Sequence, residues 1–233
     1  MIQQNRTKVV VIIPAYNEEN AVGKVVGAIP KDWVTEIIVV NNNSNDQTPL
    51  VAQQAGAVVI EQPLQGYGNA CLKGLDYLKK MENPPDIVLF LDADYSDYPE
   101  EAPLLLEPIM AGEVDMVIGS RNLGNREKGA MTPQQIFGNW LATTLIKWFY
   151  GVVYTDLGPF RAIRYQALLQ IDMQDKTYGW TVEMQVKAAK LKMKTKEVAV
   201  SYRNRIGHSK ISGTIKGTIL AGYKIITTII KYK

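Results

Sequence analysis

The stretch Ile87-Val88-Leu89-Phe90-Leu91-Asp92-Ala93-Asp94 decides the fold and locates the chemistry of this chain. Five apolar residues in succession predict a short strand that is buried on both faces. The run ends in two carboxylates that are one residue apart. In an extended segment, residues i and i+2 point the same way, so Asp92 and Asp94 can converge on one point.

Two carboxylates held that close repel each other unless a cation lies between them. Ligation by oxygen alone suits Mg²⁺ or Mn²⁺, which leave positions for water and substrate phosphates. The place also agrees with the rule that ligands bind outside the carboxyl ends of strands in open α/β sheets. The alternative is a turn in which the carboxylates accept hydrogen bonds from local N–H groups. An Asp-x-Asp alone leaves both interpretations open.

Strand-like and helix-like segments alternate on both sides of this stretch. Apolar runs at 8–13, 36–40, 57–60 and 114–119 predict further strands, separated by helical segments and short loops. This alternation predicts an α/β fold with a mostly parallel, Rossmann-like sheet and helices on both faces. The other expected elements are helices at 66–80, 99–111, 133–150 and 181–191, and strands at 160–164 and 194–202.

Length and composition indicate an ordinary globular protein. The 233 residues, of which 46% are hydrophobic and 21% charged, suffice for one α/β domain. The single cysteine, Cys71, excludes an internal disulfide and suits a reducing cytoplasm. Met1–Lys8 has no apolar core of signal-peptide length, and no apolar run approaches the roughly 20 residues of a spanning helix. We therefore expect one cytoplasmic domain over 1–233.

Charge is distributed unevenly along the chain. From Lys187 onward there are twelve Lys or Arg residues, and Glu197 is the only acid, so this part carries +11 and the rest −8 of the total +3. An acidic body with a basic end predicts an anionic partner at that end, such as phosphate, a lipid headgroup or nucleic acid. The alternative is a solvated basic face.

Two segments predicted to be helical, 133–150 and 214–233, carry many apolar residues that must be covered by protein or by membrane. In 133–150 the aromatic residues Phe137, Trp140, Trp148 and Phe149 are expected in the core rather than at an acceptor site. In 214–233, three lysines and a threonine share one arc and isoleucines occupy much of the rest. This amphipathic helix either lies on a membrane surface or packs on the body of the protein.

Several motifs occur in the order known from one family. They are Val11–Glu18 (VIIPAYNE), Asp92-Ala93-Asp94, Gly119-Ser120-Arg121, Thr155–Ala162 (TDLGPFRA) and Arg205–Lys210 (RIGHSK). Together they resemble the family 2 glycosyltransferases with the GT-A fold, and the later motifs resemble those of polyprenyl- and dolichyl-phosphate sugar transferases. The resemblance spans nearly the whole chain. It implies a nucleotide-sugar-binding half at 1–120, an acceptor half at 121–210 and a C-terminal helix at 211–233.

The resemblance also implies roles for individual residues. A divalent ion, Mg²⁺ or Mn²⁺, is expected on Asp94 with help from Asp92. The expected partners are a nucleotide-sugar donor and a lipid-phosphate or glycan acceptor, and no nucleic acid. One interpretation of the C-terminal helix is a peripheral contact with the inner face of the cell membrane. The expected nucleotide-binding residues are Pro14, Tyr16, Asn17, Glu18, Asn42, Gly68 and Asp92; the phosphate or acceptor residues are Arg121, Arg205, Ser209 and Lys210; and the catalytic residues are Asp94, Asp156 and Glu183.

Two departures from the family pattern bear on specificity. The family has Asp-Asp-Gly-Ser after its second strand, where this chain has Asn41-Asn42-Asn43-Ser44. Asn42 can still accept a hydrogen bond from a base through its carbonyl, without charge, so the base stays open. After the metal motif, Tyr95–Pro99 replaces the Gln-His-Pro-Pro of lipid-phosphate mannosyltransferases, which leaves a third metal ligand open. The glycines at 66 and 68 either admit a phosphate or simply begin a helix.

The chemistry implied is inverting transfer of a hexose, with UDP as the preferred nucleotide. A hydroxyl acceptor needs a general base, and Asp156 and Glu183 are the carboxylates in family-like positions. A phosphate acceptor is already anionic near neutral pH and needs none. Three hypotheses follow: transfer to a polyprenyl phosphate, transfer to a soluble or glycan hydroxyl, and nucleotide binding without catalysis. A sugar nucleotidyltransferase is disfavoured because no Gly-rich loop with Arg and Lys follows the first strand.

Overall fold

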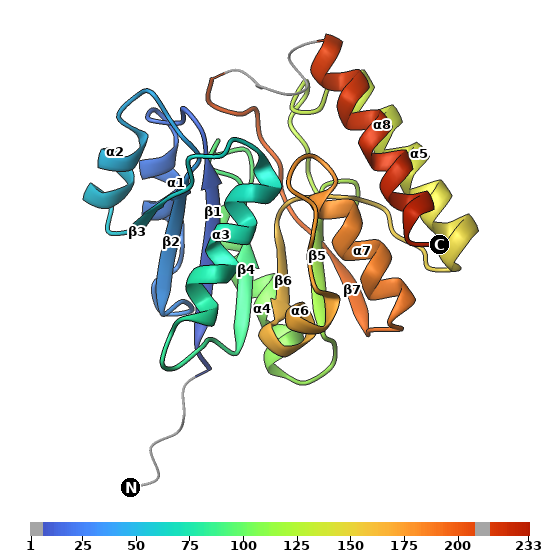
Figure 1. Cartoon of the computed structure of the whole chain (residues 1–233), viewed down its shortest axis with the longest axis horizontal. Coiled ribbons are helices and arrows are strands. Elements are labelled where there is room, and N and C mark those ends of the chain that lie inside the picture. Colours follow the sequence, from blue (N-terminus) through green and yellow to red (C-terminus); the bar gives the residue numbers. More distant parts are fainter. Residues whose placement is uncertain (1–6, 208–214) are drawn as a thin grey trace, which may run out of the picture.

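The computed structural model describes residues 7–207 and 215–233. Within these residues seven strands form one sheet in the order β3-β2-β1-β4-β6-β5-β7 (Figure 1). β6 is antiparallel to both of its neighbours, and all other pairs are parallel. The mostly parallel sheet expected from the sequence is thus confirmed. The strands are β1 (Val9–Ala15), β2 (Glu36–Asn41), β3 (Val58–Glu61), β4 (Ile87–Phe90), β5 (Met116–Ser120), β6 (Arg161–Arg164) and β7 (Thr195–Ala199).

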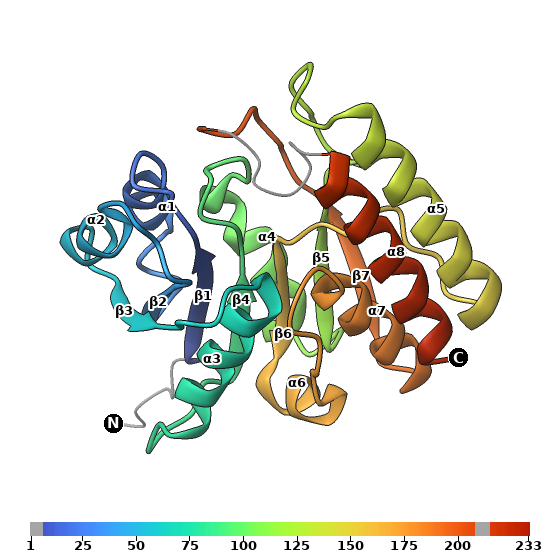
Figure 2. The same ribbon diagram turned by 45° about the horizontal axis from the view of Figure 1, so that its top comes forward.

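Helices cover both faces of the sheet (Figures 1 and 2). α1, α2 and α4 pack on one face, and α3, α6 and α7 pack on the other. α5 and α8 pack against each other and against α7, so they form an outer layer at one edge of the molecule. The helices are α1 (Val22–Ala28), α2 (Thr48–Gln54), α3 (Tyr67–Lys79), α4 (Ala102–Met110, after a 3-10 turn at Pro99–Glu101), α5 (Pro133–Tyr150), α6 (Tyr165–Ile171), α7 (Trp180–Lys190) and α8 (Ile215–Lys231).

The central strand β1 shows why the apolar runs of the sequence become sheet. Val9, Val11 and Ile13 face the core under α1 and α4, and Val10 and Ile12 face the core under α3. Every residue of β1 is buried, as a parallel strand with helices on both faces requires. The carboxyl end of such a strand is therefore held rigidly, and the segment that follows it starts from a fixed position.

Three local expectations differ from the structure. The sequence predicts that Glu18 and Glu19, which follow Pro14, lie in the first turn of a helix that runs to Ile29. In the structure α1 begins at Val22, and both acids precede it. The backbone carbonyl of Glu18 accepts the first amides, from Ala21 and Val22. This arrangement leaves the Glu18 side chain at the end of β1, where the site lies. α6 was not predicted, and β7 is shorter than the strand expected at 194–202.

The prediction that the aromatic residues of α5 lie in the core is wrong for three of the four. Phe137, Trp140 and Trp148 are 59%, 58% and 80% exposed, and only Phe149 is partly buried. α5 instead buries a stripe of smaller residues against α7 and α8, among them Ala142 and Ile146. An outer-layer helix has a single covered face, and hydrophobicity alone did not show which stripe that would be.

α8 packs on the body of the protein. Tyr150 Oη donates to the carbonyl of Ile229 at 2.6 Å, and the side chains of Thr228 and Ile229 are buried. Packing on the body is therefore confirmed for this helix, and a membrane contact stays a prediction. Across the residues that the structure describes, none of the helices has the length and hydropathy needed to span a bilayer.

Candidate active site

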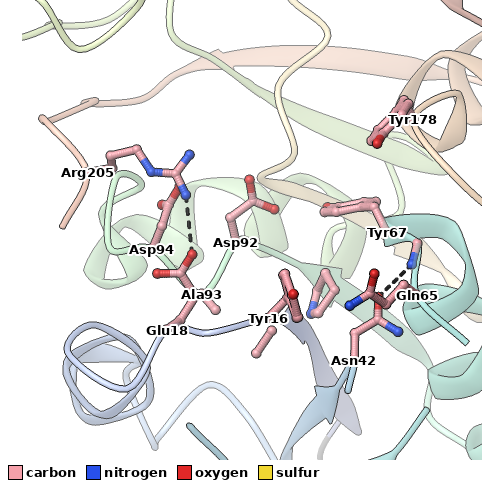
Figure 3. Close-up of a pocket in the computed structure, with 13 residues that line it drawn as sticks. Tyr16, Glu18, Asn42, Gln65, Tyr67, Asp92, Ala93, Asp94, Tyr178 and Arg205 are labelled. Atoms are coloured by element: carbon pink, nitrogen blue, oxygen red, sulfur yellow. Dashed lines mark hydrogen bonds and ion pairs between the residues drawn. The ribbon is translucent and has the colours of Figure 1, made fainter. Parts of the chain in front are cut away.

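A pocket of about 300 Å³ opens at the carboxyl ends of β1, β2 and β4 (Figure 3). β1 lies between β2 and β4, so the chain leaves the sheet in opposite directions on the two sides of this point. Such a switch point is where open α/β sheets bind ligands. The pocket is lined by Pro14, Ala15, Tyr16, Glu18, Asn42, Gln65, Gly66, Tyr67, Asp92, Ala93, Asp94, Tyr178 and Arg205.

One side of the pocket brings a cation between two acids. Arg205 Nη2 lies 3.0 Å from Asp94 Oδ2 and 3.3 Å from Glu18 Oε1. The other oxygen of Asp94 accepts from the amide and the hydroxyl of Ser96, at 2.9 and 2.6 Å. Both acids are buried, and their side chains are therefore fixed in direction by specific partners.

Asp92 is held differently. Its Oδ1 is buried and accepts no hydrogen bond from the described residues. Burial and the neighbouring carboxylate of Asp94 raise the pKa of Asp92 to about 7, while the Tyr67 hydroxyl partly opposes them. Asp97, which sequence reasoning did not single out, is also buried, and burial and the charges of Asp92 and Asp94 raise its pKa well above the usual range. A cation beside this cluster would relieve the repulsion.

The donor set fits a hard divalent ion that is shared with a substrate. Among residues 7–207 and 215–233, no group of three or more His, Cys, Asp or Glu side chains could hold a metal ion alone. Asp92 and Asp94 offer two carboxylates at the pocket wall. Mg²⁺ in particular is commonly held by one or two carboxylates together with waters and substrate phosphates. The residues present are therefore compatible with Mg²⁺ or Mn²⁺ when a phosphate-bearing ligand is bound.

Asn42 ties the segment 62–66 to the end of β2. Its Nδ2 donates to the carbonyls of Gln62 (3.1 Å) and Leu64 (2.7 Å), and its Oδ1 accepts from the amide of Gly66 (2.8 Å). An amide supplies both the donors and the acceptor that this arrangement needs, and an ionised aspartate would supply acceptors only. This is a physical reason for asparagine here. The lip of the pocket, with Gln65 and Tyr67, depends on it.

Gly66 and Gly68 are explained by close packing. Gly66 has φ +135°, and a Cβ on either glycine would clash with the backbone of Asp175 or Lys176. The amides of Gly68 and Asn69 donate to the carbonyls of Thr177 and Lys176, at 3.2 and 3.0 Å. Gly68 is not among the residues that line the pocket, and its expected contact with a nucleotide stays a prediction.

Asp156 is fully buried, and both oxygens of its carboxylate are bound by Arg121. The guanidinium forms a fork on the carboxylate at 2.7 and 2.6 Å, and the Arg121 amide donates at 2.8 Å. The pair raises the pKa of Arg121, and the guanidinium lies 5.0 Å from the ring centroid of Tyr202. Neither residue lines the pocket, so their expected roles in catalysis and phosphate binding stay predictions.

Glu183 also lies away from the pocket. It accepts from the amides of Gln174 and Asp175 and from the hydroxyl of Tyr232, and it pairs with Lys187 at 2.7 Å. These contacts give it a structural task in holding a loop, and its expected catalytic role stays a prediction.

The remaining expected residues divide into three groups. Pro14, Tyr16, Glu18, Asn42 and Arg205 line the pocket with the two aspartates, as the nucleotide and phosphate assignments require. Asn17 lies beside it and supports the turn after β2, since its amide donates to Ser44 Oγ and its Oδ1 accepts from Asn45. Ser209 and Lys210 lie outside the described residues. Gln65, Tyr67 and Tyr178 were missed, because no spacing rule links them to β4 in the sequence.

Comparisons with known proteins agree with this fold and site. Residues 10–171 match the model of Glycosyl transferase family 2. An uncharacterised glycosyltransferase of Mycobacterium tuberculosis is 33% identical over 221 residues, covering 91% of this chain and 94% of that protein. An undecaprenyl-phosphate mannosyltransferase of Micrococcus luteus is 30% identical over 226 residues, covering 90% of each.

Among solved structures, a glucosyl-3-phosphoglycerate synthase from Mycobacterium tuberculosis, in complex with Mn²⁺, UDP-glucose and phosphoglyceric acid, superimposes with a TM-score of 0.76. It is 22% identical, and the match covers 98% of this chain and 80% of that one. This likeness shows the GT-A fold. From the family model and the relatives, the chain belongs to glycosyl transferase family 2 and is a glycosyltransferase.

Proposed function

We propose that this glycosyltransferase moves a hexose, with inversion, from a nucleotide-sugar to a polyprenyl-phosphate type of acceptor, with UDP as the preferred nucleotide. The observation that carries the proposal is the convergence of Asp92, Asp94 and Arg205 at one side of the pocket, opposite Tyr16 and Asn42. A nucleoside fits the aromatic and amide side, and its diphosphate reaches the charged side.

The charged side suits the departure of a nucleoside diphosphate. A divalent ion held by Asp94 and Asp92 would stabilise the negative charge that develops on the leaving diphosphate. Arg205 offers a planar fork of donors for the same phosphates, and Glu18 and Asp94 keep that fork aimed into the pocket. Tyr67 orients Asp92 through its hydroxyl. The partial burial of these groups strengthens each interaction relative to water.

The position of the carboxylates favours a phosphate acceptor. Asp156 and Glu183, the expected bases, have their oxygens occupied by Arg121 and by a loop, respectively. A phosphate monoester is already nucleophilic near neutral pH and needs no base to remove a proton. Lipid-phosphate acceptors also agree with the undecaprenyl-phosphate mannosyltransferase among the relatives.

A soluble acceptor is the second candidate. The observation in its favour is the likeness in fold to a synthase crystallised with phosphoglyceric acid, a small acid. The two candidates differ in what they require of the protein surface, because a lipid acceptor must be met at a membrane. We propose a peripheral contact at the inner face of the cell membrane through the outer layer, α5 and α8, which exposes Phe137, Trp140, Trp148 and Tyr223. Trp and Tyr are typical of membrane interfaces.

The experiment has two stages. Calorimetry with UDP and GDP, each with and without Mn²⁺, identifies the nucleotide; binding that needs the ion supports the donor site. Transfer from the matching nucleotide-hexose is then measured to undecaprenyl phosphate, to dolichyl phosphate and to phosphoglyceric acid. Formation of a glycosyl phospholipid supports the proposal. Transfer to phosphoglyceric acid alone favours the soluble acceptor, and nucleotide binding without any transfer or donor hydrolysis favours a non-catalytic protein.

A further inference from the structure

The loop at 174–179, between α6 and α7, forms the wall of the pocket that faces α3. Tyr178 of this loop lines the pocket (Figure 3). The carbonyls of Lys176 and Thr177 accept the amides of Asn69 and Gly68, which begin α3. The loop therefore sets the position of the α3 N-terminus and of Tyr67, whose hydroxyl meets Asp92. A shift of this loop would displace two walls of the pocket together.

Two buried carboxylates hold the loop from within. Glu183 accepts the amides of Gln174 (3.0 Å) and Asp175 (2.7 Å). Asp175 in turn accepts, through Oδ1, the amides of Thr177 (2.8 Å) and Gly179 (3.0 Å). Hydrogen bonds to Glu183 and Asp175 thus hold the backbone of the loop, and its conformation depends on where these two side chains lie.

Both carboxylates are bound by the end of the chain: one by a residue of α8 and the other by Tyr232, which directly follows α8. Lys224 Nζ lies 2.9 Å from Asp175 Oδ2, and Tyr232 Oη donates to Glu183 Oε1 at 2.8 Å. Lys224 and Tyr232 are eight positions apart in the sequence, so α8 and the residue after it hold the loop at two separate points. Between them Thr228 lies close enough to Gly179 that a Cβ there would come within 2.8 Å of Thr228 Oγ1. Burial and Glu183 raise the pKa of Tyr232 to about 12, which keeps its hydroxyl protonated as a donor.

We propose that Lys224 and Tyr232 are positioning residues for the donor: α8 and the residue that follows it lie outside the pocket and hold the 174–179 loop in the conformation that binds the nucleotide-sugar. The inference rests on the proposed function for the identity of the ligand. The path runs from α8 to Asp175 and Glu183, from there to the loop, and from the loop to Tyr178 and the start of α3. Neither Lys224 nor Tyr232 lines the pocket itself.

The test uses the full chain with Lys224→Met, Tyr232→Phe and the double variant. The affinity for UDP and GDP with Mn²⁺ is measured by calorimetry, and the donor KM and the kcat by transfer assay. Coupling between sites of this kind commonly changes affinity by about fivefold or more. We expect the double variant to raise the donor Kd and KM by at least that factor while kcat stays near the wild-type value. Lys224→Arg keeps the charge and should bind the nucleotide with the wild-type affinity.

A second measurement does not depend on the ligand. The amides of Gly68 and Asn69 donate to the loop, so their hydrogen exchange should accelerate in the double variant while that of buried β1 stays unchanged. Lys233→Met is the matched control, because Lys233 Nζ lies over the Phe149 ring of α5, 4.7 Å from its centroid. It should alter neither affinity nor exchange.

The outcomes are distinguishable. Unchanged nucleotide affinity and unchanged exchange at Gly68 and Asn69 in a folded double variant would overturn the inference. A wild-type protein that binds neither UDP nor GDP would instead overturn the proposed function, and the exchange measurement would still decide whether α8 holds the loop. An increase in Kd for Lys233→Met equal to that for Lys224→Met would assign the effect to charge alone and also overturn the inference.

Discussion

Arg205 and Asp94 form an ion pair at the mouth of the pocket, with Nη2 and Oδ2 3.0 Å apart. Glu18 Oε1 lies 3.3 Å from the same nitrogen. A guanidinium and a divalent ion both seek the oxygens of Asp94, so the two compete for this carboxylate. A diphosphate offers Arg205 another partner with the same geometry. We therefore expect Arg205 to pass from the acids to the phosphates when a donor and an ion bind.

Arg205→Met tests this exchange of partners. Without nucleotide, the variant should bind Mn²⁺ more tightly than the wild type, because Asp94 and Glu18 have lost their competing cation. With UDP or GDP present, the nucleotide should bind more weakly, since a hydrogen bond to a charged group contributes about 1.5–3 kcal/mol. Electron paramagnetic resonance of free Mn²⁺ measures the first effect and calorimetry the second. The same sign for both effects would contradict the exchange.

Asp94→Asn tests the metal. The substitution keeps the shape but removes a charged ligand, so Mn²⁺ affinity should fall and transfer should slow by at least about a hundredfold. The fold should persist, because Ser96 can still donate to the Oδ1 of an asparagine. Asp76→Asn, at an exposed position on α3, is the control and should have no effect. An Asp94 variant with full activity in the presence of a chelator would remove the metal from the mechanism.

The comparison of sequence and structure separates what is local from what is not. β4, which ends just before Asp92, was predictable because five apolar residues in succession leave few alternatives. Pro14, Tyr16 and Glu18 were expected at the site from the resemblance to the family, and their place after β1 agrees with the rule about strand ends. Tyr178 could not be found in this way, because it reaches the pocket through a loop held by Glu183 and Asp175. The exposed face of α5 was mispredicted since burial there depends on α7 and α8, which are distant in sequence.

Asn42→Asp sets a base contact against the contacts that Asn42 makes within the protein. From the family pattern alone, the added charge predicts that binding of a base with an imide N–H is retained or tightened. However, the Asn42 amide group donates to the carbonyls of Gln62 and Leu64, and a carboxylate would instead repel them. Each lost or unsatisfied partner costs about 1–3 kcal/mol. We expect weaker nucleotide binding by calorimetry and a lower melting temperature. Asn43→Asp, the same change at an exposed neighbour, should be neutral. Tighter binding in the Asn42 variant would show that the base contact dominates.

Asp92 predicts a pH dependence of stability. Its pKa is raised from 3.8 to about 7 by burial and Asp94. Between these values the folded state therefore binds more protons than the unfolded state, so the free energy of unfolding decreases as pH rises through this window. Each pH unit contributes up to about 1.4 kcal/mol. Asp92→Asn removes this decrease in the free energy of unfolding. The variant should therefore be more stable than the wild type at pH 8 in the presence of chelator, but not at pH 4.

Thermal melting at the two pH values measures this difference, and Asp76→Asn again serves as the control. Added Mn²⁺ should raise the melting temperature of the wild type at pH 8 more than that of Asp92→Asn, because the ion neutralises the charge that burial disfavours. An equal difference in melting temperature between wild type and Asp92→Asn at pH 4 and pH 8 would contradict the assigned shift.

The membrane contact requires variants that leave α8 in place. Thr228 and Ile229 are buried, and Lys224 and Tyr232 hold the 174–179 loop, so deletion of the helix would expose core and disturb the pocket. Substitutions at exposed positions avoid this problem. Phe137→Ser, Trp140→Ser and Trp148→Ser should together weaken co-sedimentation with vesicles containing phosphatidylglycerol, because each ring that enters the interface contributes about 1.5 kcal/mol or more.

The matched control is Leu50→Ser, an exposed apolar residue on α2 that lies outside the outer layer. It should bind vesicles as the wild type does. Binding of the wild-type protein to the vesicles should weaken as salt screens the positive charges of the protein from the anionic lipid surface. The decisive comparison is between acceptors: in the triple variant, transfer to undecaprenyl phosphate in vesicles should fall, while transfer to a short, water-soluble prenyl phosphate stays at the wild-type rate. Equal rates of transfer to the vesicle acceptor in the variant and the wild type would remove the aromatic face of α5 from membrane docking.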